Sequence, residues 1–229
     1  MAKSQPPKTP AQLSPAVLMV PGLDNSGPDH WQSHWERRDA DCSRVDMGDW
    51  SKPHRNTWVN RLNLAIHRAA RPVVLVAHSL GCMTVAWWAH LERPAWGNPV
   101  IGALLVAPPE VDFFPRDDRI SHFAPTPLEP LPFPSIVVAS RNDPWISFET
   151  ARWLSRNWAA DFVDAGEAGH INAESQLGEW QTGFALLSRL RSDAHAVARK
   201  ARQYARDLAS EAQVPAGLVT SANPPGVAS

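Results

Sequence analysis

Short apolar runs that alternate with helical segments constrain the fold of this 229-residue chain more than any other feature. The apolar runs predict strands at Ala16–Val20, Val73–Ala77, Ile101–Val106 and Ile136–Ser140. Helical spacing of apolar residues predicts helices at Trp58–Ala69, Ser79–His90, Phe148–Trp158 and Leu177–Leu190. Strands that are apolar throughout are buried on both faces, as in parallel sheets covered by crossover helices. The right-handed crossover rule then predicts an α/β fold with a doubly wound, mostly parallel sheet of about six strands and helices on both faces.

Weaker signals complete the sheet and its connections. Arg44–Asp46 and Asp161–Asp164 are candidate strands, and Ser26–Asp29, with a proline near its start, is typical of a helix beginning. The segment Ala107–Pro134 contains eight prolines, which resist helix formation. We therefore expect this segment to run irregularly over the strand ends, where long loops are often functional.

The chain shows no internal repeat and no second domain. We expect a flexible N-terminal segment at 1–15 and one α/β domain at 16–191. The remaining part, 192–229, is polar and rich in Ala and Arg at first and low in complexity after Pro215. This composition predicts a C-terminal helix followed by a disordered tail.

The charge balance argues against several classes of partner. The chain has 22 Lys and Arg against 23 Asp and Glu, so it carries no broad positive field for nucleic acid or anionic membranes. No run approaches the ~18 apolar residues of a membrane helix, and the first residues do not resemble a secretory signal. The two cysteines, Cys42 and Cys82, form no CxxC pair and are typical of reduced thiols. We expect a cytoplasmic protein that is a monomer or a weak dimer.

The junction after the clearest strand carries a candidate nucleophile. In Ala77-His78-Ser79-Leu80-Gly81 a serine ends a buried strand and begins a helix, with small residues two before and two after it. A sharp strand-to-helix turn crowds these flanking positions and holds the serine hydroxyl exposed in strained backbone geometry. The usual pattern is G-x-S-x-G, so Ala77 is a departure. A helix N-cap serine is the alternative interpretation.

A nucleophilic serine needs a general base and an acid that orients the base. Asp143 follows the fourth apolar run and His170 follows the last candidate strand. Both are therefore expected at carboxyl ends of strands, on the same edge as Ser79 and in the chain order typical of such triads. Two alternatives stay open: Asp112, after the third run, as the working acid, and a simple Asx turn at Asp143.

Other residues near these strand ends are candidates for substrate contact. The main-chain N–H groups of Leu23 and Leu80 are candidate oxyanion donors, because they lie in the loop after the first strand and at a helix N-terminus. Asp24 and Asn25 are candidate substrate-binding residues, although turn formation explains them equally well. We expect Trp145, which closely follows the candidate acid, to line the pocket.

The sequence predicts neither a metal nor a cofactor. His30 and His34 lie four residues apart, but a zinc site needs a third ligand, and H-E-x-x-H is absent because Trp31 follows His30. The glycine-containing segment 22–27 matches neither the phosphate-loop nor the dinucleotide-binding pattern. Packing or surface histidines are the simpler interpretation.

These motifs resemble the α/β-hydrolase superfamily and, within it, the small serine hydrolases of the retinoblastoma-binding protein 9/YdeN family. The resemblance rests on Pro21–Trp31, Trp35-Glu36, Ala77–Cys82, Ser140–Pro144 and Gly169–Asn172, and covers about Val17 to Leu190. It implies a fold without a large cap domain and a triad of Ser79, Asp143 and His170. It leaves the substrate open.

Two functions of different class are compatible with these observations. The first is a serine hydrolase that cleaves small acyl esters, or amides, through an acyl-Ser79 intermediate. The second is a protein- or ligand-binding module on a hydrolase scaffold with incidental turnover, because a fold alone does not determine function. The complete set of three reactive residues favours the enzyme, since a pure binder need not retain all of them.

Overall fold

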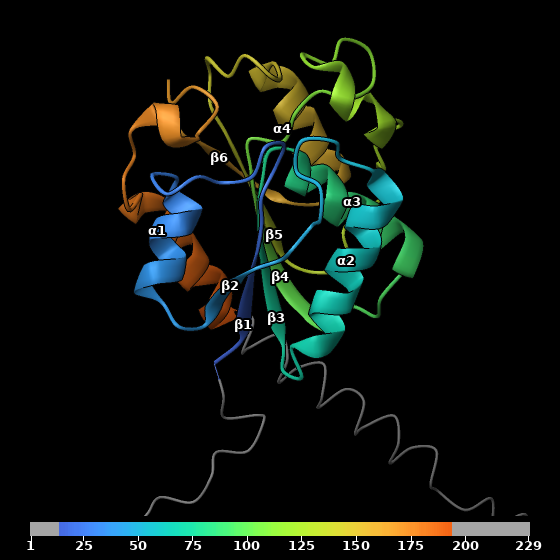
Figure 1. Ribbon diagram of the computed structural model, residues 1–229, viewed down its shortest axis with the longest axis vertical. Coiled ribbons are helices and arrows are strands. Elements are labelled where there is room, and N and C mark those ends of the chain that lie inside the picture. The colour runs from blue at the N-terminus through green and yellow to red at the C-terminus, as the bar shows by residue number, and fades with distance from the viewer. Residues whose placement is uncertain (1–13, 194–229) are drawn as a thin grey trace, which may run out of the picture.

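The protein, seen here in a computed structural model, is built on a six-stranded sheet (Figure 1). The spatial order is β2-β1-β3-β4-β5-β6, and every neighbouring pair is parallel. The strands are β1 (Ala16–Val20), β2 (Cys42–Arg44), β3 (Val73–His78), β4 (Val100–Val106), β5 (Ser135–Ala139) and β6 (Asp161–Asp164). The predicted α/β class and the parallel sheet are confirmed.

The structure describes residues 14–193. The predictions for the flexible start and for the C-terminal helix and tail lie almost wholly outside these residues. Within the described range, no helix is both long and apolar enough to cross a membrane.

The order of the strands creates a switch point near the middle of the sheet. The chain begins at β1, places β2 at one edge, returns past β1 to β3 and then continues outward to β6. Connections therefore leave in opposite directions on the two sides of the β1/β3 pair. In open parallel sheets, ligands bind beyond the carboxyl ends of the strands at such a point. Ser79 directly follows β3 there.

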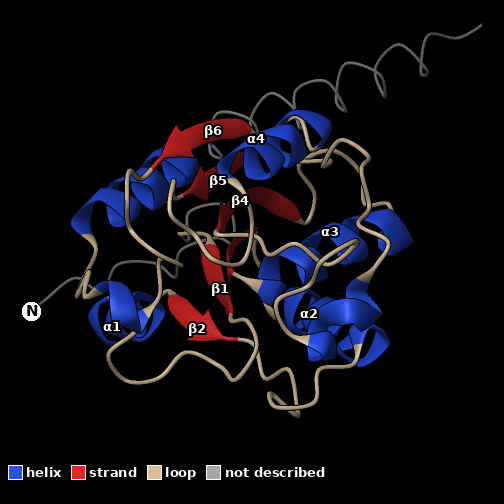
Figure 2. Ribbon diagram, turned by 90° about the horizontal axis from the view of Figure 1, so that it is seen from above, coloured by secondary structure: helices blue, strands red, loops and turns tan. Residues whose placement is uncertain are grey.

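Helices cover both faces of the sheet (Figure 2). One face carries α1 (Trp31–Arg38) and the helix at 181–193, and the other carries α2 (Arg55–Arg68), α3 (Leu80–Glu92) and α4 (Phe148–Asn157). Side chains of β3 alternate between the two cores: Leu75 packs in one and Val76 in the other. This alternation is why the whole strand must be apolar.

The four apolar runs form strands whose ends lie within one residue of the predicted bounds. The edge strand was predicted two residues too late, because β2 pairs through Cys42 with Val17 rather than through the residues after Arg44. Asp46 instead belongs to a turn, in which its carboxylate accepts a hydrogen bond from the Gly48 N–H at 2.9 Å.

Two predicted helices begin later than expected. The first was expected near Ser26 but begins at Trp31, because His30 is its N-cap and accepts a hydrogen bond from the Gln32 N–H at 3.1 Å. The Ser26 hydroxyl donates to the Gln32 side chain instead and so belongs to the preceding loop. The last helix begins at residue 181 rather than at Leu177.

The proline-rich segment between β4 and β5 is irregular, as predicted, except for one short 3₁₀ helix. This helix, η2 (Asp118–Phe123), contains none of the eight prolines and buries Ile120 and Phe123. Arg116, Asp117 and Arg119 of the segment line the main pocket at the carboxyl edge of the sheet. Within residues 14–193 no cap domain covers that edge.

Candidate active site

Ser79 occupies a sharp turn with no loop residue between β3 and α3. Its φ of 52° and ψ of −126° lie outside the regions that most L-residues adopt. The Ser79 N–H donates to the Val106 carbonyl at 2.9 Å, and the Ser79 carbonyl accepts from the Cys82 N–H at 2.8 Å. The hydroxyl makes no capping hydrogen bond to α3, so the helix-cap interpretation does not explain this serine.

Two glycines leave the space that this turn needs. A Cβ at Gly81 would lie 2.1 Å from the Val20 carbonyl oxygen, and a Cβ at Gly22 would lie 2.7 Å from the Ser79 Cβ. Both distances are too short for non-bonded atoms. The first turn of α3 therefore packs directly against the end of β1 and the loop after it.

We expect Gly81→Ala to lower the free energy of unfolding by about 3 kcal/mol, because the new Cβ overlaps a backbone oxygen of β1. Urea unfolding followed by circular dichroism measures this loss. Gly27→Ala is the matched control, since a Cβ there meets no atom within 4 Å. Equal losses in the two variants would contradict the role assigned to the close contact.

Three side chains at the carboxyl edge form one hydrogen-bonded chain. His170 Nε2 lies 2.8 Å from Ser79 Oγ, and His170 Nδ1 lies 2.9 and 3.0 Å from the two carboxylate oxygens of Asp143. The Asp143 side chain is fully buried and that of His170 is 7% exposed. With the Nδ1 proton donated to the carboxylate, the Nε2 lone pair is available to the serine hydroxyl. An imidazole in this geometry can accept the serine proton.

Asp112, the alternative acid, lies in a different hydrogen-bond network. Its carboxylate accepts from the Thr126 N–H at 2.8 Å, and its own N–H donates to the Glu110 carboxylate at 2.7 Å. Asp143 makes the turn contact that the sequence left open, a 2.9 Å hydrogen bond from the Trp145 N–H, in addition to holding His170. The geometry therefore favours Asp143 as the orienting acid.

Ser79 and His170 line a pocket of about 690 Å³, whereas the fully buried Asp143 is not part of its wall. The Trp145 ring stacks on the His170 ring with centroids 5.2 Å apart and an interplanar angle of 24°. The Arg116 guanidinium lies 5.9 Å from the centroid of the same indole. Trp145 therefore lines the pocket directly beside the imidazole of His170.

Asp24 and Asn25 reach the pocket wall but are engaged by other protein groups. Both have positive φ angles, 59° and 65°, which the turn after β1 requires. Arg119 donates to the Asp24 carboxylate at 3.0 and 3.1 Å, and Arg44 donates to Asn25 Oδ1 at 3.0 Å. Formation of the turn and these hydrogen bonds therefore explain Asp24 and Asn25 without any contact to a substrate.

The two candidate oxyanion donors lie on adjoining pieces of main chain. A Cβ at Gly22 would lie 3.1 Å from the Leu80 nitrogen, so the loop that contains Leu23 packs against the beginning of α3. Leu23 lines the pocket, and Leu80 is the first residue of α3. The structure therefore brings both segments next to Ser79.

Two further histidines line the same pocket. The His78 ring lies 4.7 Å from the His30 ring and 5.0 Å from the His170 ring. Burial, with smaller contributions from Arg44, His170 and His34, lowers the pKa of His30 to about 3. Burial also holds the pKa of His78 well below its ordinary value, and His30 and His170 add to this effect. Both rings are therefore neutral near pH 7.

Residues 14–193 hold no group of three or more side chains suited to bind a metal ion. His30 uses Nδ1 to accept the hydrogen bond from the Gln32 N–H, and His34 Nδ1 lies 3.1 Å from the Arg37 guanidinium. The two histidines that were weighed as ligands thus have separate partners.

Sequence reasoning missed most of the polar wall of the pocket. The missed lining residues are His30, His78, Arg116, Asp117, Arg119, Asn142, Glu167, Asn172, Glu174 and Ser175. They are single polar residues in loops or at element ends, which carry no periodic signal. The available indications were that His78, Asn142 and Asn172 lie within two residues of the candidate catalytic residues, and that the proline-rich segment was expected to run over the strand ends.

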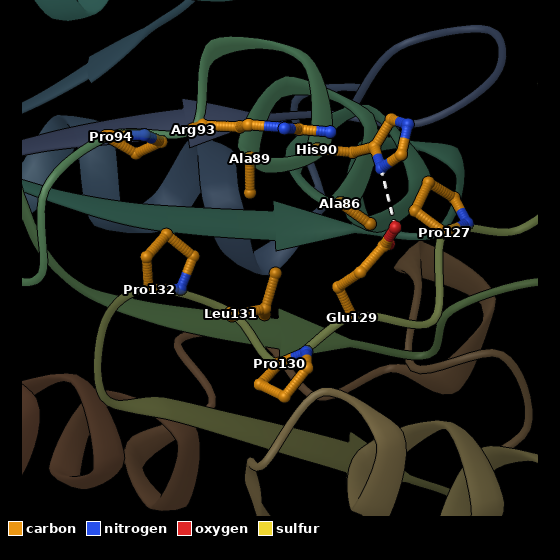
Figure 3. A pocket seen from close by; sticks show the side chains of 10 residues that line it. All are labelled: Ala86, Ala89, His90, Arg93, Pro94, Pro127, Glu129, Pro130, Leu131 and Pro132. Carbon is orange, nitrogen blue, oxygen red and sulfur yellow. Dashed lines mark hydrogen bonds and ion pairs between the residues drawn. The ribbon is translucent and has the colours of Figure 1, made fainter.

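A second pocket, of about 260 Å³, lies at the far end of α3 (Figure 3). It is formed by residues of α3 from Ala86 onward and by the proline-rich stretch Pro127–Pro132, and His90 pairs with Glu129 across it at 2.9 Å. Ser79 precedes the opposite end of the helix. This second pocket therefore contains none of the three hydrogen-bonded residues.

Comparison with known proteins agrees with the fold. The chain matches the serine hydrolase family model over residues 17–189, and it belongs to this family. A YdeN-like hydrolase from Pectobacterium atrosepticum is 32% identical, with a TM-score of 0.71 over 79% of this chain and 92% of that chain. The resemblance seen in the sequence is confirmed: the protein is an enzyme of the α/β-hydrolase fold, similar to YdeN-type small serine hydrolases.

More distant structures share the fold alone. The ydeN gene product of B. subtilis is 21% identical, with a TM-score of 0.64 over 78% of this chain and all of that chain (100%). Esterase 2 of Thermogutta terrifontis is 14% identical, with a TM-score of 0.59 over 81% of this chain and 85% of that chain. No curated protein matched the chain in sequence.

Proposed function

We propose that this serine hydrolase cleaves small acyl esters, and by the same chemistry some amides, through an acyl-Ser79 intermediate. One observation carries the proposal: His170 is hydrogen-bonded to Ser79 Oγ at 2.8 Å and to Asp143 at 2.9 Å. A serine activated by an oriented imidazole is the arrangement that acyl transfer requires.

The first half of the reaction transfers the acyl group to the enzyme. Ser79 Oγ attacks the carbonyl carbon while His170 Nε2 takes the hydroxyl proton, and the Asp143 carboxylate stabilises the resulting imidazolium. The N–H groups of Leu23 and Leu80 donate to the carbonyl oxygen as it becomes negative. His170 then gives its proton to the departing alcohol oxygen, and the acyl-Ser79 ester remains.

The second half regenerates the enzyme. His170 takes a proton from a water molecule, whose oxygen attacks the acyl carbon, and the same two main-chain N–H groups hold the second oxyanion. When the intermediate collapses, His170 returns the proton to Ser79 Oγ. The products are a carboxylic acid and the free serine.

The pocket supports a short or polar acyl group. Charged, amide, imidazole and hydroxyl side chains together form most of its wall, and Trp145 is the one tryptophan, tyrosine or phenylalanine among its lining residues. A long alkyl chain would gain little burial of apolar surface there and would desolvate polar groups. Stacking on the indole beside His170 suits a small flat or short-chain substrate.

The test is covalent labelling with a fluorophosphonate, which reacts with an activated serine. We expect wild-type protein to be labelled and to hydrolyse p-nitrophenyl acetate, and Ser79→Ala to lose both. Ser188→Ala, which changes an exposed serine outside the pocket, is the matched control and should be labelled normally.

Three outcomes would contradict parts of the proposal. Labelling that persists in Ser79→Ala would exclude this serine as the nucleophile. Folded wild type that is neither labelled nor active would favour the binding-module interpretation. A series of p-nitrophenyl esters from acetyl to decanoyl should show kcat/KM falling with chain length, and a rise would exclude the preference for short acyl groups.

A further inference from the structure

The segment that carries His170 has little regular structure of its own. Between β6 and the last helix it contains only one short 3₁₀ turn, η3 (Ala173–Ser175). Ile171, the residue directly after His170, is fully buried and has a φ of 48°, in the left-handed region that β-branched residues rarely adopt. A conformation of this kind persists only when surrounding contacts hold it in place.

Ser140 Oγ and Asn142 Oδ1 accept hydrogen bonds from the N–H groups just before His170, and two buried side chains from other elements hold the carbonyl groups of His170 and Ile171. The His78 imidazole lies with Nε2 2.9 Å from the carbonyl oxygen of His170, and the Trp31 indole N–H donates to the carbonyl oxygen of Ile171 at 2.8 Å. His78 is 5% exposed and Trp31 is 1% exposed. Consecutive carbonyl groups are thus held from the end of β3 and from the first residue of α1.

The tautomer of His78 follows from its partner. A carbonyl oxygen only accepts hydrogen bonds, so His78 Nε2 must carry a proton and act as the donor. The His78 ring also contacts the His170 ring, at a centroid distance of 5.0 Å. His78 therefore contacts both the main chain and the side chain of His170, but it makes no hydrogen bond to Ser79 Oγ or to Asp143.

We propose that His78 and Trp31 are positioning residues that fix the base, His170, relative to the nucleophile. This inference rests on the proposed hydrolase chemistry. His78 is the residue immediately before Ser79, so one strand end sets the place of the nucleophile and also holds the base. Trp31, whose ring lies 6.1 Å from that of His78, holds the next carbonyl group, at the strained Ile171. We call these two hydrogen bonds to the loop the clamp.

The reaction explains why such a clamp is needed. His170 must keep one partner at Nε2 and another at Nδ1 through two proton transfers in each half-reaction. Misplacing a catalytic group by about 1 Å can cost roughly 100-fold in rate. A loop without its own hydrogen-bond ladder cannot supply that precision, so side chains from rigid elements must do so.

The first test compares two substitutions of His78. His78→Leu removes the N–H donor and replaces the imidazole with an apolar side chain of similar size. His78→Gln instead retains an N–H donor at a similar distance from the main chain. We expect His78→Leu to lower kcat for p-nitrophenyl acetate by about 10- to 100-fold with KM changed by less than about 3-fold. His78→Gln should recover most of kcat, and equal losses in both variants would overturn the donor role.

The second test uses tryptophan variants and remains informative if His78→Leu does not fold. Trp31→Phe removes the N–H that holds Ile171 and should lower kcat by about 10-fold. Trp158→Phe is the matched control: Trp158 is equally buried, and its indole donates to the Pro127 carbonyl at 2.8 Å, at the end of α4 away from the pocket. Equal effects of the two tryptophan changes on kcat per folded molecule would overturn the clamp.

A measurement without turnover separates this inference from the proposed function. The His170 Nδ1 proton shared with Asp143 should give a far-downfield proton NMR resonance that Asp143→Asn abolishes. We expect the resonance to be retained in Trp158→Phe and His78→Gln but broadened or lost in His78→Leu and Trp31→Phe. Wild type with the resonance but no hydrolysis would overturn the function alone, whereas an unchanged resonance in His78→Leu and Trp31→Phe would overturn the clamp alone.

Discussion

Replacing Asp143 with asparagine is expected to lower kcat/KM for p-nitrophenyl acetate by about 10⁴-fold without unfolding the protein. The Asp143 side chain is fully buried, and both of its oxygens lie within 3.0 Å of His170 Nδ1. An asparagine amide that faces the ring as a donor favours the tautomer with its proton on Nε2. That tautomer cannot accept the Ser79 proton. Initial rates at pH 8 for wild type and variant measure the loss.

Asp112→Asn is the matched control for this experiment. It is the same chemical change at the other acid that the sequence offered, and the carboxylate there accepts from the Thr126 N–H rather than from His170. We expect kcat/KM to stay within about 3-fold of wild type, since an asparagine oxygen can still accept that hydrogen bond. If Asp112→Asn were the damaging change, Asp143 would be the wrong acid.

Acidification from pH 7.5 to pH 5 is expected to destabilise the folded protein strongly. His30 has a folded pKa of about 3, and burial also holds the pKa of His78 well below 6.5. A histidine in the unfolded chain has a pKa of about 6.5. Below that pH the two histidines are therefore protonated in the unfolded chain but stay neutral in the folded protein. Their contribution to the free energy of unfolding is therefore fully present above about pH 6.5 and is lost as the pH falls below that value. Two such groups give a slope of up to about 2.7 kcal/mol per pH unit.

The pH window isolates these two histidines. Carboxylates with a lowered pKa, such as Asp39 and Asp117, affect stability only below about pH 4.5, where their unfolded forms take up protons. Urea unfolding at pH 7.5, 6.0 and 5.0 therefore reports mainly on the buried imidazoles.

A substitution of His30 assigns part of this slope to one residue. His30→Asn keeps a helix-capping oxygen for α1 but removes the titrating group, so it should reduce the slope by up to about 1.4 kcal/mol per pH unit. His67→Gln, at an exposed position on α2, is the control and should leave the slope unchanged. A wild-type stability that does not vary between pH 7.5 and 5 would show that these rings are not buried in neutral form.

Much of the fold was predictable from the sequence because the signals involved are local. Val73–His78 must be apolar on both faces, since alternate side chains enter two different cores, and a run of this kind is visible without any structure. The placement of Ser79, Asp143 and His170 at carboxyl ends of strands followed from the same pattern. The structure brings these three within hydrogen-bond distance, and their catalytic roles remain our proposal.

The errors in the prediction arose where tertiary contacts outweigh local preference. Ser26 has the composition of a helix start, but its hydroxyl is used by the Gln32 side chain, and His30 is the actual cap. The sequence favoured Asp143 as the acid but left Asp112 open, because both follow a strand at the same edge. The loop that carries His170 brings the imidazole to the Asp143 carboxylate, whereas the Asp112 carboxylate accepts from the Thr126 N–H.

The sequence by itself determined the order of strands and helices and the edge of the sheet at which the reactive residues gather. Apolar periodicity and the handedness of crossovers depend on residues close together in the chain, so they can be read from it directly. The tertiary structure showed that Asp143 rather than Asp112 holds His170, and it alone decided which polar residues form the pocket wall and how His78 and Trp31 reach the loop after β6. These features depend on contacts between residues as many as 140 positions apart, as between Trp31 and Ile171, and no local pattern encodes such distances.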